Sequence, residues 1–170
     1  MDFFDVLAKR HSVRQFSNRE IREPELNTIL KAADAAPSAG NLQSYQIVTI
    51  RDQKHKTALA LAAYGQDFIS GAPVILVFCA DPAIAAAKYD GRGAELFCIQ
   101  DATIAASYAQ LAAAALGLAT VWVGAFDEKM VAKIVGGLKP VCILPIGHAA
   151  SGPEITTRRN LDDLVHQEHL

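Results

Sequence analysis

Two arginines, a histidine and a serine lie within five residues near the N-terminus, in the stretch RHSVR from Arg10 to Arg14. In an extended segment the side chains of Arg10, Ser12 and Arg14 would fall on one side. Guanidinium groups bind phosphate oxygens bidentately, and a hydroxyl adds a further donor. Because hydrogen bonds to charged groups contribute about 1.5–3 kcal/mol each, three such donors can hold a phosphate dianion. The spacing therefore predicts a phosphate site, with a solvated loop capped by Ser12 as the alternative.

Two further polar features accompany the RHSVR segment. A second basic pair, Arg158 and Arg159, lies close to the C-terminus. Between the two basic stretches lies a polar loop, SAGNLQ, from Ser38 to Gln43. Its amides offer both hydrogen-bond donors and acceptors, as the edge of a heterocycle requires. The loop is therefore a second candidate binding element.

Three other stretches match chemistry-bearing motifs only in part. GRGAEL, residues 91–96, ends in leucine and follows no expected strand, so it is not a dinucleotide fingerprint. The stretch APSAG around Ser38 nearly matches a nucleophile elbow, but Ala36 replaces the first glycine and a helix precedes it. A hydrolase that uses Ser38 is kept as an alternative. His166 and His169 lack an acidic or cysteine partner at suitable spacing, which favours a solvated tail over a metal site.

The composition restricts the class of protein. The chain has 170 residues, of which 51% are hydrophobic, so a single domain with a substantial core is expected over residues 1–170. Lys and Arg total 16 against 18 Asp and Glu, which gives a net charge of −2. This balance argues against a nucleic-acid binder that relies on a broad basic field. The two arginines of RHSVR are therefore a local feature.

The sequence favours a cytoplasmic protein. Cys79, Cys98 and Cys142 lie far apart in apolar runs, as expected for reduced core residues. The N-terminal MDFFDVLAKR has acidic residues where a signal peptide needs basic ones, so no targeting segment is expected. Residues 96–120 are alanine-rich but include several polar side chains, which are costly in lipid. This helix is expected in a protein core or a subunit interface, not in a membrane.

Hydrophobic patterning predicts an α+β fold, with one central sheet of four strands covered by about five helices. The expected strands are residues 45–51, 73–80, 119–124 and 141–147. The expected helices are residues 2–9, 24–35, 52–63, a long helix that ends at Gly117, and 127–135. Residues 88–95, KYDGRGAE, are expected to form a loop or the approach to the long helix, and LDDLVH near the C-terminus is a late amphipathic piece.

These stretches, in this order, resemble the FMN-dependent nitroreductase family. Six segments spread over nearly the whole chain carry the resemblance, and their collinear order makes it specific. The segments are RHSVRQF, AAPSAGNLQS, GQDFISGAPVILVFCAD, the alanine-rich helix running into GLATVWVGAF, ILPIGH and RRNLDDLVH.

The resemblance implies a fold and an activity. The fold is a three-layer α/β/α sandwich with a mainly antiparallel four-stranded sheet, which the partner's C-terminal tail extends in an intertwined homodimer. FMN would lie at the subunit interface. The activity would be ping-pong transfer of two electrons from NADH or NADPH to nitroaromatics, quinones or similar small acceptors. The alternative is a dimer that holds FMN or a related nucleotide without turnover, as a store or sensor.

The resemblance also implies roles for individual residues, though no catalytic side chain and no metal site. Arg10, Ser12 and Arg14 would grip the FMN phosphate, with His11 beside them through its backbone. Arg158 and Arg159 would close over the same phosphate, and the Gln66 side-chain amide would contact the ring or ribityl chain. Backbone N–H groups of Gly124 and Ala125 would lie near flavin N5. A loop of the partner subunit would lie against the flavin, with Pro37, Ser38, Ala39, Asn41 and Gln43.

The chain departs from the family pattern in two places. Ser44-Tyr45 stands where many members have proline and an aromatic residue after the Asn-x-Gln pattern. The stretch between Val48 and Gly117 is short, so we expect an open and permissive pocket. Tyr89 and Arg92 are candidates for substrate contacts, whereas Trp122 is expected in the core.

Overall fold

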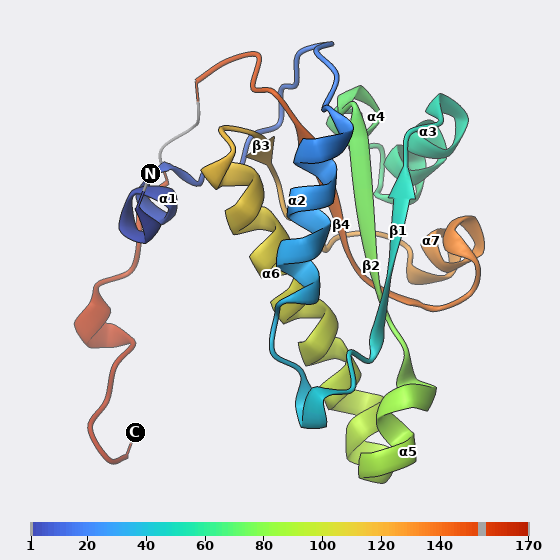
Figure 1. Cartoon of the computed structure of the whole chain (residues 1–170), viewed down its shortest axis with the longest axis vertical. Coiled ribbons are helices and arrows are strands. Elements are labelled where there is room, and N and C mark those ends of the chain that lie inside the picture. The colour runs from blue at the N-terminus through green and yellow to red at the C-terminus, as the bar shows by residue number, and fades with distance from the viewer. Residues whose placement is uncertain (1, 153–155, 170) are drawn as a thin grey trace.

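A four-stranded antiparallel sheet forms the centre of the molecule in the computed structural model, which describes residues 2–152 and 156–169 (Figure 1). The strands are β1 (Tyr45–Ile50), β2 (Val74–Ala80), β3 (Ala119–Thr120) and β4 (Lys139–Gly147), in the order β1-β2-β4-β3. In the β1–β2 pair, Tyr45 lies opposite Ala80 and Ile50 opposite Ile75. The expected α+β class with four strands is confirmed.

Every residue of β2 is buried, because helices cover both faces of the sheet. Val74, Leu76 and Phe78 point to one face, where they pack with α2 (Glu23–Asp34) and α6 (Cys98–Ala115). The alternate residues pack with α3 (Gln53–Ala62) and α7 (Glu128–Val135) on the other face. The molecule is therefore the three-layer sandwich that the sequence predicts. The extension of the sheet by a partner's tail stays a prediction.

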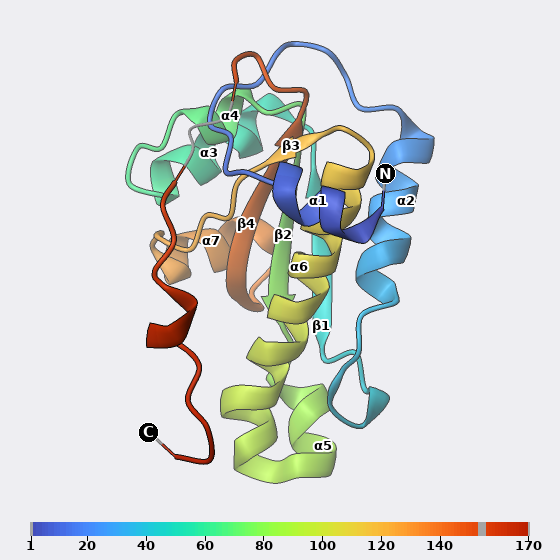
Figure 2. The same cartoon turned by 90° about the vertical axis from the view of Figure 1, so that its left-hand side faces the viewer.

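Helix α6 lies against α2 and the sheet along its length (Figures 1 and 2). Its alanines at positions 102, 105, 106, 109 and 113 are fully buried. Because these side chains are small, the backbone of α6 can approach its neighbours closely. Gly117, at φ +75°, follows its last turn in the left-handed conformation that favours glycine. In the described residues no helix combines the length and the apolar character needed to cross a bilayer.

Residues 88–95 form the approach to the long helix, which is one of the two arrangements expected for this stretch. Asp81 caps α5 (Pro82–Arg92), which continues through a π-helical turn (Gly93–Phe97) into α6. The chain bends at Tyr89 and Asp90, where Asp90 has φ +47°. A Cβ on Gly93 would lie 2.4 Å from the carbonyl oxygen of Ala85, so only glycine permits this close approach.

The third strand is shorter than expected. Its ladder covers Ala119–Thr120, and Val123 then forms an isolated bridge with Ile143. The N-terminal segment forms an isolated parallel bridge to this strand, between Ser12 and Thr120. Trp122 is half-buried and packs against the α2–α6 core, as expected.

The remaining connections are short. Helix α1 (Phe3–Lys9) begins at a capping box formed by Asp2 and Asp5. A 3-10 turn (Ala39–Asn41) joins α2 to β1, and α4 (Phe68–Gly71) joins α3 to β2. LDDLVH contains only a 3-10 turn (Leu161–Asp163), and the whole segment 156–169 is exposed.

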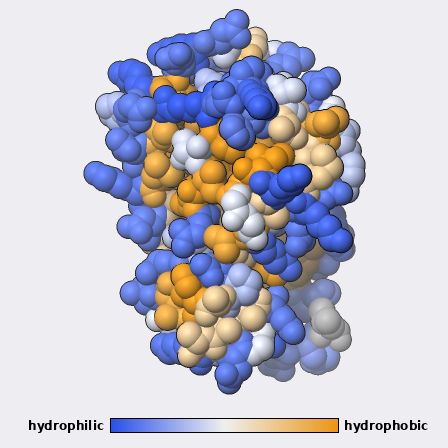
Figure 3. All heavy atoms as spheres, turned by 90° about the vertical axis from the view of Figure 1, so that its right-hand side faces the viewer, coloured by the Kyte–Doolittle hydropathy of each residue, from blue (hydrophilic) through white to orange (hydrophobic). Residues whose placement is uncertain are grey.

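On the β1 side of the molecule, hydrophobic residues gather in the middle of the surface and hydrophilic ones surround them (Figure 3).

Candidate functional site

The RHSVR segment is extended and joins the sheet beside β3. Ser12 forms a parallel bridge with Thr120, and the Val13 N–H donates to the Thr120 carbonyl at 3.0 Å. Val13 is buried, and its packing fixes the segment against the sheet. The polar residues on both sides of Val13 are therefore held by main-chain pairing and by one apolar anchor.

The two arginines of this segment have different surroundings. Arg10 and His11 line a pocket of about 230 Å³ together with Gly117 and Thr120. The guanidinium of Arg14 lies over the ring of Phe68 in α4, with 5.9 Å between the guanidinium carbon and the ring centroid. Such cation–π contacts contribute about 0.5–1 kcal/mol at exposed sites. Among the described residues no carboxylate forms an ion pair with either arginine, so both guanidiniums can receive an anion.

Gln66 links two loops at the same end of the sheet as Arg14. Its side-chain amide donates to the carbonyls of Ala63 at 2.9 Å and Ala125 at 3.1 Å. Gly124 and Ala125 are both exposed. A Cβ on Gly124 would meet only the Trp122 ring, at 3.5 Å, so the backbone here is open to a flat ligand. The structure thus brings together the predicted residues Gln66, Gly124 and Ala125.

The polar loop at residues 37–43 is held by its own side chains. The Ser38 hydroxyl accepts from the Gln43 N–H at 3.0 Å and from the Gln43 side-chain amide at 3.1 Å. The same amide donates to the Asn41 side-chain oxygen at 2.7 Å. Asn41 and Gln43 both have positive φ, at +58° and +45°, which asparagine tolerates better than most residues. Pro37, Ser38 and Ala39 line a pocket of about 480 Å³ with residues of α6.

Asp101 anchors this loop, and sequence reasoning did not identify that role. The carboxylate, only 2% exposed, accepts from the Ala39 N–H at 2.9 Å and from the Ser44 hydroxyl at 2.5 Å. No lysine or arginine pairs with it among the residues that the structure describes. Burial, with a smaller contribution from Asp34 and Asp101, raises the pKa of the Tyr45 hydroxyl nearby. The sequence feature that could have indicated this role is Asp101 itself, a charged residue within an otherwise apolar helix.

The two groups of predicted residues lie at opposite ends of α6. Asp101 holds the 37–43 loop near the start of the helix, and Ala114 lines the Arg10 pocket near its end. The intervening 13 residues correspond to about 20 Å along the axis, at about 1.5 Å per residue. Both views of the chain show this separation, with the loop beside α5 and the RHSVR segment beside β3 (Figures 1 and 2).

The C-terminal basic pair stands apart from both groups. Arg158 and Arg159 are exposed, and the Arg159 guanidinium donates to the Asp163 carbonyl at 3.2 Å. The tail that carries them runs beside the body of the molecule, away from α6 (Figure 2). No hydrogen bond within the described residues joins this pair to the RHSVR segment. The pair's predicted role is therefore untested.

The profile of the Nitroreductase family matches two overlapping stretches, residues 7–66 and 60–148, which contain both groups of predicted residues. The chain belongs to the nitroreductase family. This nitroreductase-family chain is similar to a Bacillus subtilis protein named FMN reductase, NAD(P)H. The two are 30% identical over 178 residues, covering 95% of this chain and 72% of that one. The resemblance inferred from the motifs is confirmed.

Solved structures of family members share the fold. The structure of B. megaterium NfrA2 has a TM-score of 0.91 and 29% identity, covering 100% of this chain and 76% of that one. The NADPH:FMN oxidoreductase from Vibrio harveyi, complexed with NAD+, has a TM-score of 0.90 and 26% identity, covering 99% of this chain and 77% of that one. This chain therefore shares the fold of both solved structures.

Proposed function

We propose that this nitroreductase-family protein is an FMN-dependent oxidoreductase. It takes two electrons from NADH or NADPH and passes them to a small acceptor such as a nitroaromatic or a quinone. Family membership supports the coarser activity, as do relatives named FMN reductase and NADPH-flavin oxidoreductase. The observation that carries the proposal is the Gln66–Ala125 hydrogen bond, which joins two of the predicted cofactor residues next to the open backbone at Gly124.

The residues present fit FMN. Arg10, Ser12 and Arg14 would hold the phosphate, because one hydroxyl and two guanidiniums that no carboxylate of the described residues pairs with offer charge-assisted hydrogen bonds. The N–H groups of Gly124 and Ala125, both exposed residues, would donate to the ring, and the small side chains there would leave room for a nicotinamide. When bound, FMN supplies the two-electron chemistry, and the protein supplies binding and orientation.

The site is complete only in a homodimer under this proposal. The 37–43 loop of one subunit would reach the cofactor held by Arg10 and Arg14 of the other, since α6 separates the two groups within one chain. Helix α1 supports an interface, because Phe3, Phe4 and Leu7 are 58%, 77% and 45% exposed. Exposed apolar surface of this kind is typical of interaction sites. Arg158 would close over the phosphate from the exposed tail, with Arg159 beside it.

The absorbance spectrum of the purified protein, recorded before and after anaerobic addition of NADH or NADPH, tests the activity. An oxidoreductase gives a yellow protein that bleaches and then recovers its colour when a quinone is added. A yellow protein that neither cofactor bleaches supports the alternative of a store or sensor. A colourless protein that binds no added FMN contradicts both.

A hydrolase that uses Ser38 finds no support in the geometry. The Ser38 hydroxyl is engaged by the backbone and side chain of Gln43. No histidine hydrogen-bonds to Ser38 among the described residues, so the hydroxyl lacks the base that would activate it. Inactivation by a serine-directed reagent would be the observation in its favour.

A further inference from the structure

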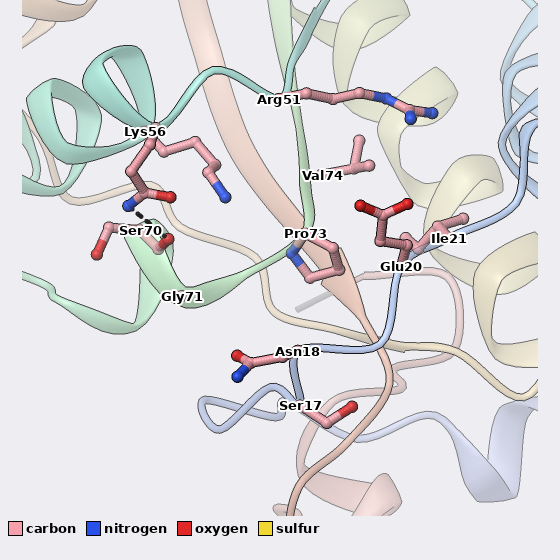
Figure 4. Close-up of a pocket in the computed structure, with 11 residues that line it drawn as sticks. Ser17, Asn18, Glu20, Ile21, Arg51, Lys56, Ser70, Gly71, Pro73 and Val74 are labelled. Atoms are coloured by element: carbon pink, nitrogen blue, oxygen red, sulfur yellow. Dashed lines mark hydrogen bonds between the residues drawn. The ribbon is translucent and has the colours of Figure 1, made fainter.

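A pocket of about 510 Å³ lies where β1 ends and β2 begins, and none of the residues assigned to FMN lines it. Three segments line it, residues 17–21, 51–56 and 70–74 (Figure 4). The volume is in the range of sites that bind small molecules. None of the lining residues belongs to the predicted cofactor site, so the proposed function leaves this pocket unexplained.

Lys56, on the wall of this pocket, is an unusual residue. It is only 8% exposed, although lysine is almost never buried without a partner. Its ammonium donates to the Ala72 carbonyl at 2.9 Å, which uses one of three donors. Among the described residues no carboxylate forms an ion pair with it. Burial lowers the pKa of the Lys56 ammonium, and the negative charge of Asp52 raises it by a smaller amount. The Asp52 carboxylate is itself hydrogen-bonded to the His55 ring.

The other charged groups of the pocket divide it into two sides. Figure 4 shows the Lys56 side chain extending from α3 toward the middle of the pocket. The Arg51 guanidinium pairs with Glu23 at 2.6 Å, so its charge is already offset. The Glu20 carboxylate stands on the opposite side, on the segment that carries Asn18 (Figure 4). Within the described residues the pocket thus presents an ammonium without a carboxylate partner on the α3 side, and the exposed Glu20 carboxylate on the opposite side.

We propose that this pocket binds a small monocarboxylate that also carries a hydroxyl or amino group, with the carboxylate on Lys56 and the second group toward Glu20. The ligand's carboxylate supplies the negative charge that would pair with the buried Lys56 ammonium. The ligand's hydroxyl or amino group donates a hydrogen bond to the Glu20 carboxylate. A phosphate dianion fits less well, because its second charge would face the Glu20 carboxylate. The site is independent of the proposed flavin chemistry.

The test uses flavin-loaded protein in which the lysine side chains are labelled with carbon-13 at Cε. The Lys56 resonance is identified by its loss in Lys56→Met. L-lactate is titrated against sodium chloride at matched ionic strength. We expect a saturable shift of the Lys56 resonance with lactate and a several-fold weaker response to propionate, which lacks the hydroxyl. Lys54, exposed on the same helix, is the internal control and should not move.

Two variants separate this site from the arginine segment. Arg14→Ala should leave the lactate response of Lys56 intact, whereas Glu20→Gln should reduce the preference for lactate over propionate. The proposal is wrong if lactate shifts Lys56 no more than chloride does, or if Lys54 shifts equally. A response to inorganic phosphate without one to lactate would overturn the carboxylate assignment.

Discussion

The Asp101 carboxylate accepts a hydrogen bond from the Ser44 hydroxyl at 2.5 Å, in a setting where the carboxylate is 2% exposed. This contact joins residues that are 57 positions apart. It fixes the end of the 37–43 loop to α6 just before β1 begins. Ser44, where the chain departs from the family pattern, therefore has a structural role, because its hydroxyl donates a hydrogen bond to the buried Asp101 carboxylate.

Replacing Asp101 should loosen this loop. Asp101→Ala leaves the Ala39 N–H and the Ser44 hydroxyl without partners, at a cost of about 1–3 kcal/mol. We expect amide hydrogen exchange in residues 37–44 to rise about 5–150-fold, with a smaller rise in Asp101→Asn, which keeps an acceptor. Ser107→Ala is the control, since that hydroxyl bonds only within α6, to Thr103 at 2.9 Å. Unchanged exchange in Asp101→Ala would contradict the anchoring role.

Arg14→Ala should weaken FMN binding and keep the fold. The loss of one charge-assisted hydrogen bond of about 1.5–3 kcal/mol predicts about 10–150-fold lower affinity. The side chain is exposed and contacts the Phe68 ring, so the melting temperature should change little. Titration of apoprotein with FMN, followed by quenching of flavin fluorescence, measures the affinity. Arg19→Ala, exposed on the same segment, is the control, and equal affinities for both variants would remove Arg14 from the phosphate site.

Gly93→Ala should destabilise the hairpin of α5 and α6. The added Cβ would lie 2.4 Å from the Ala85 carbonyl oxygen, and a backbone atom cannot move aside without shifting the helix. Overpacking of this kind costs about 1–3 kcal/mol. Gly91→Ala, where nothing lies within 4 Å, should be neutral or slightly stabilising. Urea unfolding of the two variants measures the difference, and equal midpoints would show that the hairpin adjusts.

The three cysteines should be inert in the folded protein. All are fully buried, and burial raises the pKa of Cys79 to about 11 and raises those of Cys98 and Cys142 as well. Since the thiolate is the reactive form, iodoacetamide at pH 8 should modify none of them. Addition of urea should expose all three, as counted by mass spectrometry. Modification before unfolding would show that the sheet opens locally.

The sequence was informative where local signals agreed with packing. The apolar run of β2, the expected helix starts at residues 52 and 127, and the glycine stop at Gly117 all match the structure, in which Asp52 and Asp127 cap α3 and α7. These signals act within one turn or one strand, so they need no knowledge of distant contacts.

The sequence was less informative where the outcome depends on distant contacts. The sequence left residues 88–95 as either a loop or the approach to the long helix, and the structure shows a kink at Tyr89 and Asp90 followed by a π-helical turn into α6. The third strand is shorter than expected, since its ladder ends at Thr120 and Val123 forms only an isolated bridge with Ile143. Asp101 resembled a polar interruption of an apolar helix, and only the fold brings Ser44 to it.

Helix α6 holds the aspartate that fixes the loop at one end and lines the Arg10 pocket at the other. In the proposed dimer each copy of this helix would serve both cofactors, one at each end. An insertion or deletion of one turn would change its length by about 5.4 Å and displace both sites together. Under this proposal the length of α6 would set the spacing between the 37–43 loop and the Arg10 pocket, so a one-turn insertion in this chain's α6 should weaken FMN binding.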